Sequence, residues 1–217
     1  MGSLPRNRVT ARMKISHRQL EECRQQPRQW LVNASNVYTG PRRLGYAQVL
    51  QLAVHKYHKD GATAARQHLT ALVARAQLRD SIRVDLTTAS LDSYIDWYTG
   101  SGTITVDDRV RLFLDIQGYL SLAGEVSRVD ITPEGYRGVL LGTAPRGWKD
   151  QLRMPLLQVA LAATFGRPSS EIWVGIQELD GSGLAVATFS SRRIAEAERE
   201  FLALGEQVRG LIGGTGV

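Results

Sequence analysis

The 217-residue sequence contains very little cysteine, very little lysine and no long apolar run. Its one cysteine, Cys23, excludes an internal disulfide and any all-cysteine zinc or iron–sulfur site within a single chain. The longest apolar stretch begins at Met154 and is interrupted by Gln158, so it falls short of the roughly 18 residues that predict a membrane span. Residues 1–14 are basic and lack the apolar core of a secretion signal. We therefore expect a cytoplasmic protein with no membrane partner.

Lysine supplies only four of the 27 basic residues, and arginine supplies the other 23. The net charge is +6 and the isoelectric point is near 9.8. Because a guanidinium group can bind phosphate in a bidentate manner, this balance favours a polyanionic partner. GC-rich genomes also encode arginine freely, so solvated surface charge stays open as the alternative. With 43% hydrophobic and 22% charged residues, the composition is that of a globular protein and not of a disordered one.

One principal domain is expected over residues 15–204, between a flexible basic segment (1–14) and a flexible tail (205–217). Apolar spacing predicts helices over about 15–33, 46–58, 62–79, 150–166 and 190–210, and helical or part-helical segments over 90–98 and 106–114. Alternating apolar residues predict two hairpins, 119–131 with 136–144 and 171–179 with 184–190. This order predicts an α/β (α+β) fold in which a central mixed β-sheet is flanked by helices.

The first hairpin carries a motif. Residues 124–130 read GEVSRVD and, after a turn, residues 139–144 read VLLGTA. This layout resembles the PD-(D/E)XK nuclease superfamily, specifically its RecB-like branch, which includes nucleases of CRISPR adaptation. Active members read close to G-x-x-D-R-[VI]-D and then [VI]-D-x-K. The resemblance places Ser127 at the first aspartate, Leu141 at the second acid and Thr143 at the lysine.

These three replacements affect the chemistry together. A hard Mg²⁺ or Mn²⁺ ion requires carboxylate oxygens, and the lysine stabilises the charge that develops on the phosphate. Serine is a weak neutral ligand, leucine is no ligand and threonine carries no positive charge. The resemblance therefore implies a pseudonuclease that has a nuclease frame, no catalytic residues and no metal cofactor.

The resemblance extends from about residue 15 to residue 204. The N-terminal pattern of the branch, S-x-S-x-L-x-x-F-x-x-C-P-x-x-[FW], is matched at Ser16, Leu20, Pro27 and Trp30. Gln26 stands at its cysteine position, so the iron–sulfur site of some members is not expected. The branch also has a G-x-x-x-H motif at the start of a helix. One register puts Val49 at the histidine position, and the other puts His55 there with Gln51 at the glycine position, which favours a structural role for His55.

Two alternatives stay open. Glu125, Asp130 or Asp115 could supply metal ligands from nearby positions, which would leave an active Mg²⁺- or Mn²⁺-dependent nuclease with a migrated site. On a regular strand, however, Glu125 and Ser127 share one face while Asp130 lies on the other. The second alternative is a protein-interaction scaffold, either a homodimer or a subunit of a larger DNA-repair or antiviral-defence assembly. The apolar stripe of the last helix could then cover the sheet or bind the partner (Ile194, Ala197, Phe201 and Leu204).

Nucleic acid is the partner that we expect. A cleft without acids is more positive and can keep its phosphate contacts. The expected contacts are basic side chains near the first helix, in the Gly-Pro loop and after the hairpin (Lys14, Arg18, Arg28, Arg42, Arg43, Arg146, Lys149 and Arg153). Trp30 and Trp148 are expected to stack on bases. The sequence thus predicts binding of DNA or RNA without cleavage.

Overall fold

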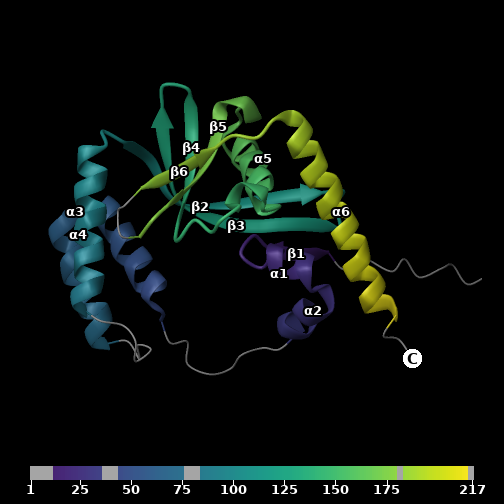
Figure 1. The fold of residues 1–217 in the computed structure, drawn as a ribbon, viewed down its shortest axis with the longest axis horizontal. Coiled ribbons are helices and arrows are strands. Elements are labelled where there is room, and N and C mark those ends of the chain that lie inside the picture. Colours follow the sequence, from purple (N-terminus) through teal and green to yellow (C-terminus); the bar gives the residue numbers. More distant parts are fainter. Residues whose placement is uncertain (1–11, 36–43, 76–83, 180–182, 215–217) are drawn as a thin grey trace, which may run out of the picture.

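The structure is a computed structural model that describes residues 12–35, 44–75, 84–179 and 183–214. Its strands are β1 (Met13–Ser16), β2 (Ile104–Ile116), β3 (Leu120–Thr132), β4 (Gly135–Leu141), β5 (Ile172–Gln177) and β6 (Leu184–Ala187). Its helices are α1 (Leu20–Gln25), α2 (Pro27–Ser35), α3 (Tyr46–Arg75), α4 (Val84–Gly100), α5 (Arg153–Phe165) and α6 (Ser191–Gly214), with 3-10 turns η1 (Trp148–Asp150) and η2 (Ser169–Glu171). In Figure 1, α3 and α4 lie on one side of the sheet, and α5 and α6 lie on the other.

The described strands form one mixed sheet. Its order is β1-β3-β4-β5-β6, and β2 pairs with β3. β1 is parallel to β3 and β4 is parallel to β5, whereas β2–β3, β3–β4 and β5–β6 are antiparallel. The β3–β4 and β5–β6 pairs are the two predicted hairpins. The prediction of a mixed sheet flanked by helices is confirmed.

Strand β2 corrects the sequence-based expectation for the segment before the first hairpin. Residues 106–114, expected to be helical or part-helical, belong to this strand. Val110, Leu112 and Leu114 are buried and alternate with exposed residues. Burial of every second residue is the pattern of a half-buried strand, and a helix would instead bury residues three and four apart.

Strand β1 is a second element that the sequence does not predict. It begins at Met13, inside the segment expected to be flexible, and only Ile15 among its four residues is buried. Its backbone pairs in parallel with residues 120–123 of β3. Pairing with a distant strand therefore orders a segment that is too short and too polar to be recognised as a strand from its own residues.

The helices agree with the sequence except at the C-terminal end. α3 contains a kink at Gly61, whose φ of 84° favours glycine. The kink lies between the two helices expected over residues 46–58 and 62–79. α5 ends before Gly166, as predicted. α6 continues to Gly214, so residues 205–214 are helical and do not belong to a flexible tail. Gly205 and Val208 are buried, which explains why the helix continues past the predicted boundary.

The core consists of two apolar clusters. The larger one joins the sheet to α5, α6, α1 and α2. It includes Ala197, Phe201 and Leu204, so most of the apolar stripe of α6 packs inside the molecule and does not face a partner. The smaller cluster joins α3 and α4 to Leu141 and Leu179. Among the described helices, none has the length and apolar character needed to cross a membrane.

Candidate functional site

The sheet has a gap along one edge of β3. β2 pairs with β3 along nearly its whole length. On the opposite edge, β1 pairs with residues 120–123 and β4 pairs with residues 128–132. Over the described chain, residues 124–127 of β3 therefore have no strand beside them on that edge. Crevices at which neighbouring strands diverge are common ligand sites in α/β proteins, because loops from both strands converge there.

A pocket of about 260 Å³ lies at this gap. Its lining brings together the three motif positions and seven further residues: Ser127, Leu141 and Thr143, with His17, Arg18, Gln51, Leu140, Gly142, Arg153 and Ile176. The Ser127 hydroxyl accepts a hydrogen bond from the backbone N–H of Leu141 (3.2 Å). The Gln51 amide donates one to the carbonyl oxygen of Leu141 (2.8 Å). These two bonds hold the end of β4 against β3 and α3, and so fix one wall of the pocket.

His17 is the member of this site that sequence reasoning misses. It follows β1 and donates its backbone N–H to the carbonyl of Ala123 (2.8 Å), which places its ring beside the gap. The side chain is only 3% exposed, and its Nδ1 has no hydrogen-bond partner among the described residues. Burial, with the charges of Arg153 and Arg18, lowers the pKa of His17 from 6.5 to about 4. The imidazole is therefore neutral at pH 7 and has an unused polar atom next to two cations.

Gly124 makes room for this histidine. A Cβ atom at Gly124 would lie 2.9 Å from Cδ2 and 3.2 Å from Cγ of His17, closer than side chains normally approach. The close approach of the His17 ring to β3 therefore explains why a glycine stands at the start of GEVSRVD.

Two arginines give the pocket its charge. Arg18 is exposed, while Arg153 is partly buried at the start of α5 and donates from Nε to Oε1 of Gln151 (2.7 Å). Burial lowers the pKa of Arg153, but arginine stays protonated at neutral pH. Glu21 lies nearby and accepts from the backbone N–H of Arg153 (3.2 Å). None of the described residues that line the pocket is Asp or Glu, so its chemistry suits an anion.

The three proposed replacement acids lie in different surroundings, and Asp115 pairs with Arg12 and lines neither this pocket nor its neighbour. Glu125 lines a neighbouring pocket and forms an ion pair with Arg109 (3.3 Å). Asp130 is fully buried and forms ion pairs with Arg128 (2.9 Å) and Arg137 (3.1 Å). Neither lines the pocket that contains Ser127. Across the described residues, no group of three or more His, Cys, Asp or Glu is placed to hold a metal ion.

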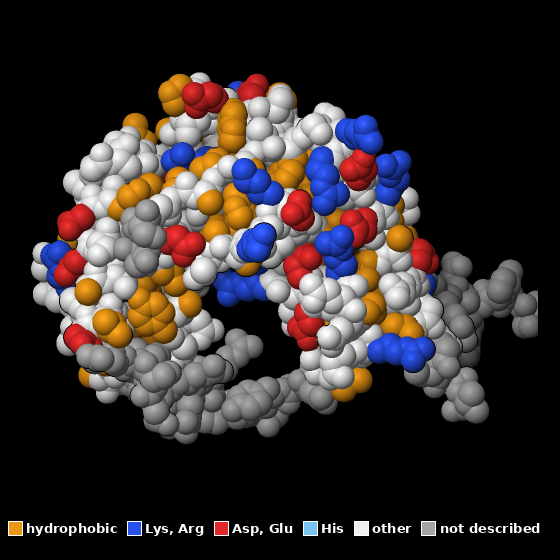
Figure 2. Space-filling view, viewed as in Figure 1, with side chains coloured by type: hydrophobic (Ala, Val, Ile, Leu, Met, Phe, Trp, Pro, Cys, Tyr) orange, Lys and Arg blue, Asp and Glu red, His pale blue; other side chains and the backbone are white. Residues whose placement is uncertain are grey.

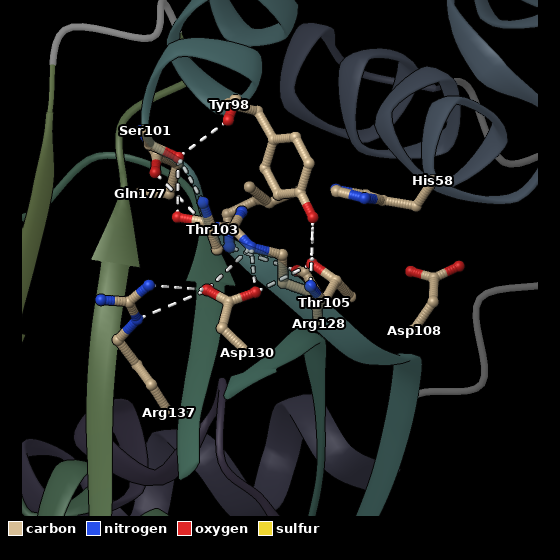
Figure 3. Close-up of polar contacts among 12 residues, drawn as sticks. His58, Tyr98, Ser101, Thr103, Thr105, Asp108, Arg128, Asp130, Arg137 and Gln177 are labelled. Carbon is tan, nitrogen blue, oxygen red and sulfur yellow. Dashed lines mark hydrogen bonds and ion pairs between the residues drawn. The ribbon is translucent and has the colours of Figure 1, made fainter. Parts of the chain in front are cut away.

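Asp130 belongs to a buried polar network at the α4 side of the sheet (Figure 3). Its Oδ1 also accepts from the Thr105 hydroxyl (2.9 Å), so the carboxylate is surrounded by donors. Its partner Arg128 is fully buried and donates to the Tyr94 hydroxyl (2.6 Å). The rings of Tyr94, Trp97 and Tyr98 lie within 6 Å of the Arg128 guanidinium. We interpret this network as structural, because the buried Arg128 guanidinium has partners within it: it donates to Asp130, to the Tyr94 hydroxyl and to Gln177.

The predicted nucleic-acid contacts divide into three groups. Arg153 and Arg18 line the Ser127 pocket, and Lys14 and Arg18 line a neighbouring pocket of about 500 Å³, which shares His17 and Arg18 with the first. Arg28, Arg146 and Lys149 are exposed, but they line neither pocket. Arg42 and Arg43 lie outside the described residues.

The expectation for the two tryptophans is wrong. Trp30 is 5% exposed and Trp148 is 8% exposed, and both belong to the larger apolar cluster. Rings with so little exposed surface offer almost nothing for a base to stack on, and Nζ of Lys149 lies 5.8 Å from the centre of the Trp148 ring. The Pro-initiated helix α2 and the turn η1 direct these rings inward, which the sequence pattern does not reveal.

The pockets lie where the surface is hollowed. Figure 2 shows a hollow between the α3–α4 part of the molecule and the α1–α2 part, with Lys and Arg side chains gathered at its inner end. The pocket residues come from both sides of this region, Gln51 from α3 and His17 and Arg18 from the segment between β1 and α1. His55, the other candidate of the helix motif, does not line the pocket and bonds from Nδ1 to Oδ1 of Asp108 (2.6 Å).

Comparison with known proteins supports the fold. No family model and no curated protein matches the sequence. The structure is similar to the crystal structure of a protein from Eubacterium rectale described as a "putative exonuclease", with 9% identity and a TM-score of 0.52, covering 99% of this chain and 88% of that chain. A second crystal structure, of SSO0001, has 10% identity and a TM-score of 0.26 over 85% of this chain and 83% of that one, which is too low to bear on the fold. The chain thus has a mixed α/β, nuclease-like fold.

Proposed function

We propose that this protein is a RecB-like member of the PD-(D/E)XK superfamily that binds nucleic acid and does not cleave it. The observation that carries the proposal is the composition of the pocket at the open edge of β3. Arg18, Arg153 and the unpartnered His17 gather around the positions at which the nuclease motif would hold its metal ion.

The pocket offers the donors that a phosphate requires. Guanidinium groups bind phosphate oxygens with charge-assisted hydrogen bonds, which are stronger than neutral ones. The hydroxyl of Thr143, an exposed residue of the lining, adds a polar contact beside them. A phosphodiester carries one negative charge, so it would also relieve the repulsion between the two cations. Phosphate recognition explains why these groups share one cavity.

Cleavage would need groups that the pocket does not provide. Metal-assisted hydrolysis uses clustered carboxylate oxygens to hold the ion and to position the attacking water. The nearby acids have other partners, because Glu21 bonds to the backbone of Arg153 and Glu125 pairs with Arg109. Asp130 is enclosed by two guanidinium groups. We therefore assign the site to binding.

Fluorescence anisotropy with labelled single- and double-stranded oligonucleotides tests the proposal. Arg18→Gln removes an exposed cation from the pocket, and it should weaken binding roughly tenfold and lower the slope of log affinity against log salt by about one. Arg192→Gln is the matched control, because Arg192 is exposed on α6 and pairs with Glu196 away from the pocket. Arg192→Gln should change affinity by less than twofold. Equal effects of the two variants, or no binding by the wild type, would refute the proposal.

A cleavage assay decides between binding and the migrated active site. Purified protein is incubated with Mg²⁺ or Mn²⁺ and labelled DNA or RNA, and we expect no cleavage. Glu125→Gln and Asp130→Asn serve as controls for contaminating nucleases. Cleavage by the wild type that disappears in Glu125→Gln, or in Asp130→Asn protein that circular dichroism shows to be folded, would establish the migrated site and overturn the assignment.

A further inference from the structure

The solvent face of the β1-β3-β2 part of the sheet adjoins the candidate site. Strand register places residues in rows across the three strands, because directly paired residues point to the same side. One row contains Ser16, Ala123 and Phe113, and the next contains Lys14, Ser121 and Asp115. Lys14, Phe113 and Asp115 are exposed, so this is the outward face, while Val110, Leu112 and Leu114 point into the core.

Phe113 is an unusual residue for such a face. Its side chain is 47% exposed, in contrast to the two tryptophans that were expected to stack on bases. The guanidinium of Arg12 lies 5.0 Å from the centre of its ring, and Arg111 is exposed two residues away on the same side of β2. Arg12 also pairs with Asp115. An exposed aromatic ring near cations on a sheet face combines stacking with phosphate attraction, and a base that stacks on it would displace Arg12 or use the other face of the ring.

The same face leads from Phe113 to the pocket. Along β3, Ala123 and Glu125 lie on the same side as Phe113, because they pair directly with Phe113 and Arg111 of β2, and Ser127 follows two residues later. Ala123 and Glu125 line the 500 Å³ pocket, and Ser127 lines the 260 Å³ pocket. Four residues of strand span about 13 Å, which is the length of about four stacked nucleotides. One strand can thus lie in the pocket with its phosphates and reach Phe113 with a base.

We infer that Phe113 is a stacking platform for an unpaired base, and that the sheet face between Phe113 and the Ser127 pocket binds a single strand of nucleic acid. This inference rests on the proposed nucleic-acid function and adds the form of nucleic acid that is bound. A duplex cannot use the platform, because the faces of its bases are already stacked on one another. Arg12 lies over the ring, and Lys14 and Arg111 are exposed on the same face, while its acids Asp115 and Glu125 are paired with Arg12 and Arg109, so the unpaired charge of the face is positive.

The test measures the affinity of Phe113 variants for a single-stranded oligonucleotide of about 12 nucleotides, within the range of known single-strand sites. Phe113→Leu keeps an apolar side chain but loses the ring, and should weaken binding roughly tenfold. Phe113→Trp should bind at least as tightly as the wild type. Ile104→Ala is the control, because Ile104 is an exposed apolar residue at the other end of β2, and it should have no effect. DNA and RNA strands of the same sequence are used in parallel.

An abasic strand of the same length isolates the stacking contact. It keeps the phosphates and lacks the bases, so Phe113→Leu should change its affinity by less than twofold, whereas Arg18→Gln should still weaken it. For the duplex, Phe113→Leu should likewise leave the affinity unchanged within twofold, and Arg18→Gln should weaken binding. If Phe113→Leu leaves both single-stranded oligonucleotides unaffected while Arg18→Gln weakens them, the platform is refuted and the proposed function stands. If no oligonucleotide binds, both fail.

Discussion

Removal of the Asp130 carboxylate offers a sharp test of whether this residue is a structural anion or a metal ligand. Asp130 and Arg128 are both fully buried, with 2.9 Å between Oδ1 and Nε, and Arg137 contacts the same carboxylate. Asp130→Asn leaves the Arg128 cation buried without its counter-charge. Loss of one partner of a buried pair costs about 3–5 kcal/mol. For a chain of this size, that loss lowers the melting temperature by roughly 6–20 °C.

Urea unfolding followed by circular dichroism measures the free energy of unfolding directly. The matched control is Asp92→Asn, which breaks an ion pair of similar length with Arg66 (2.8 Å) that is exposed on both sides. That change should cost less than about 1 kcal/mol. The double variant Arg128→Met with Asp130→Leu should recover much of the lost stability, because an apolar pair of similar volume needs no charge compensation.

The folded Asp130→Asn protein should bind oligonucleotides with the wild-type affinity, since Asp130 does not line either pocket. A loss of stability below about 1 kcal/mol would refute the reasoning, because it would mean that Arg128 does not depend on this carboxylate. A large change in nucleic-acid affinity at unchanged stability would also refute it, and would place Asp130 in the binding site.

Three further predictions concern the pocket. The pKa of His17 is lowered from 6.5 to about 4, so the unfolded chain binds more protons than the folded chain between these pH values. The free energy of unfolding should therefore fall by up to about 3 kcal/mol through His17 as the pH drops from 6.5 to 4. His17→Gln should remove this contribution in urea titrations, while the contribution of His58, whose pKa is also lowered to about 4, should remain. Gly124→Ala should cost about 1–3 kcal/mol by crowding His17, whereas Gly100→Ala, which meets no atom within 4 Å, should cost little in the same titration. Ser127→Asp should weaken oligonucleotide binding about tenfold more than Ser127→Asn in anisotropy assays, because it puts an anion beside Arg153. Equal affinities of the two Ser127 variants would contradict an anion site.

Local patterns in the sequence predict much of the fold. The alternation in residues 119–131 and the turn after Thr132 predict the hairpin of β3 and β4. The apolar run from Met154 predicts α5. Residues 106–114 are misread because their outward positions include apolar Phe113, so the strand does not alternate cleanly between apolar and polar. That exposed phenylalanine, which weakens the strand signal, is the residue to which we assign the stacking role.

The site was harder to predict than the fold because it depends on long-range pairing. The nuclease motif correctly identifies Ser127, Leu141 and Thr143 as neighbours, since all three follow from one hairpin. His17 reaches the same pocket only because β1 pairs with a strand more than a hundred residues later in the chain. Trp30 and Trp148 fit the motif and the composition, but only the packing of α2 and η1 shows that they are buried.

The pocket is shaped by contacts within the chain. It exists because β1 and β4 leave the same edge of β3 at different points, and the walls are held by backbone pairing, by the Ser127–Leu141 bond and by Gln51. Replacing carboxylates in such a cavity with neutral groups changes the sign of its potential and leaves its geometry in place. Two arginines that would balance clustered acids around a metal ion are then free to attract phosphate. Under the proposed function, this frame binds a nucleic-acid strand at the positions where the nuclease motif would hold its metal ion.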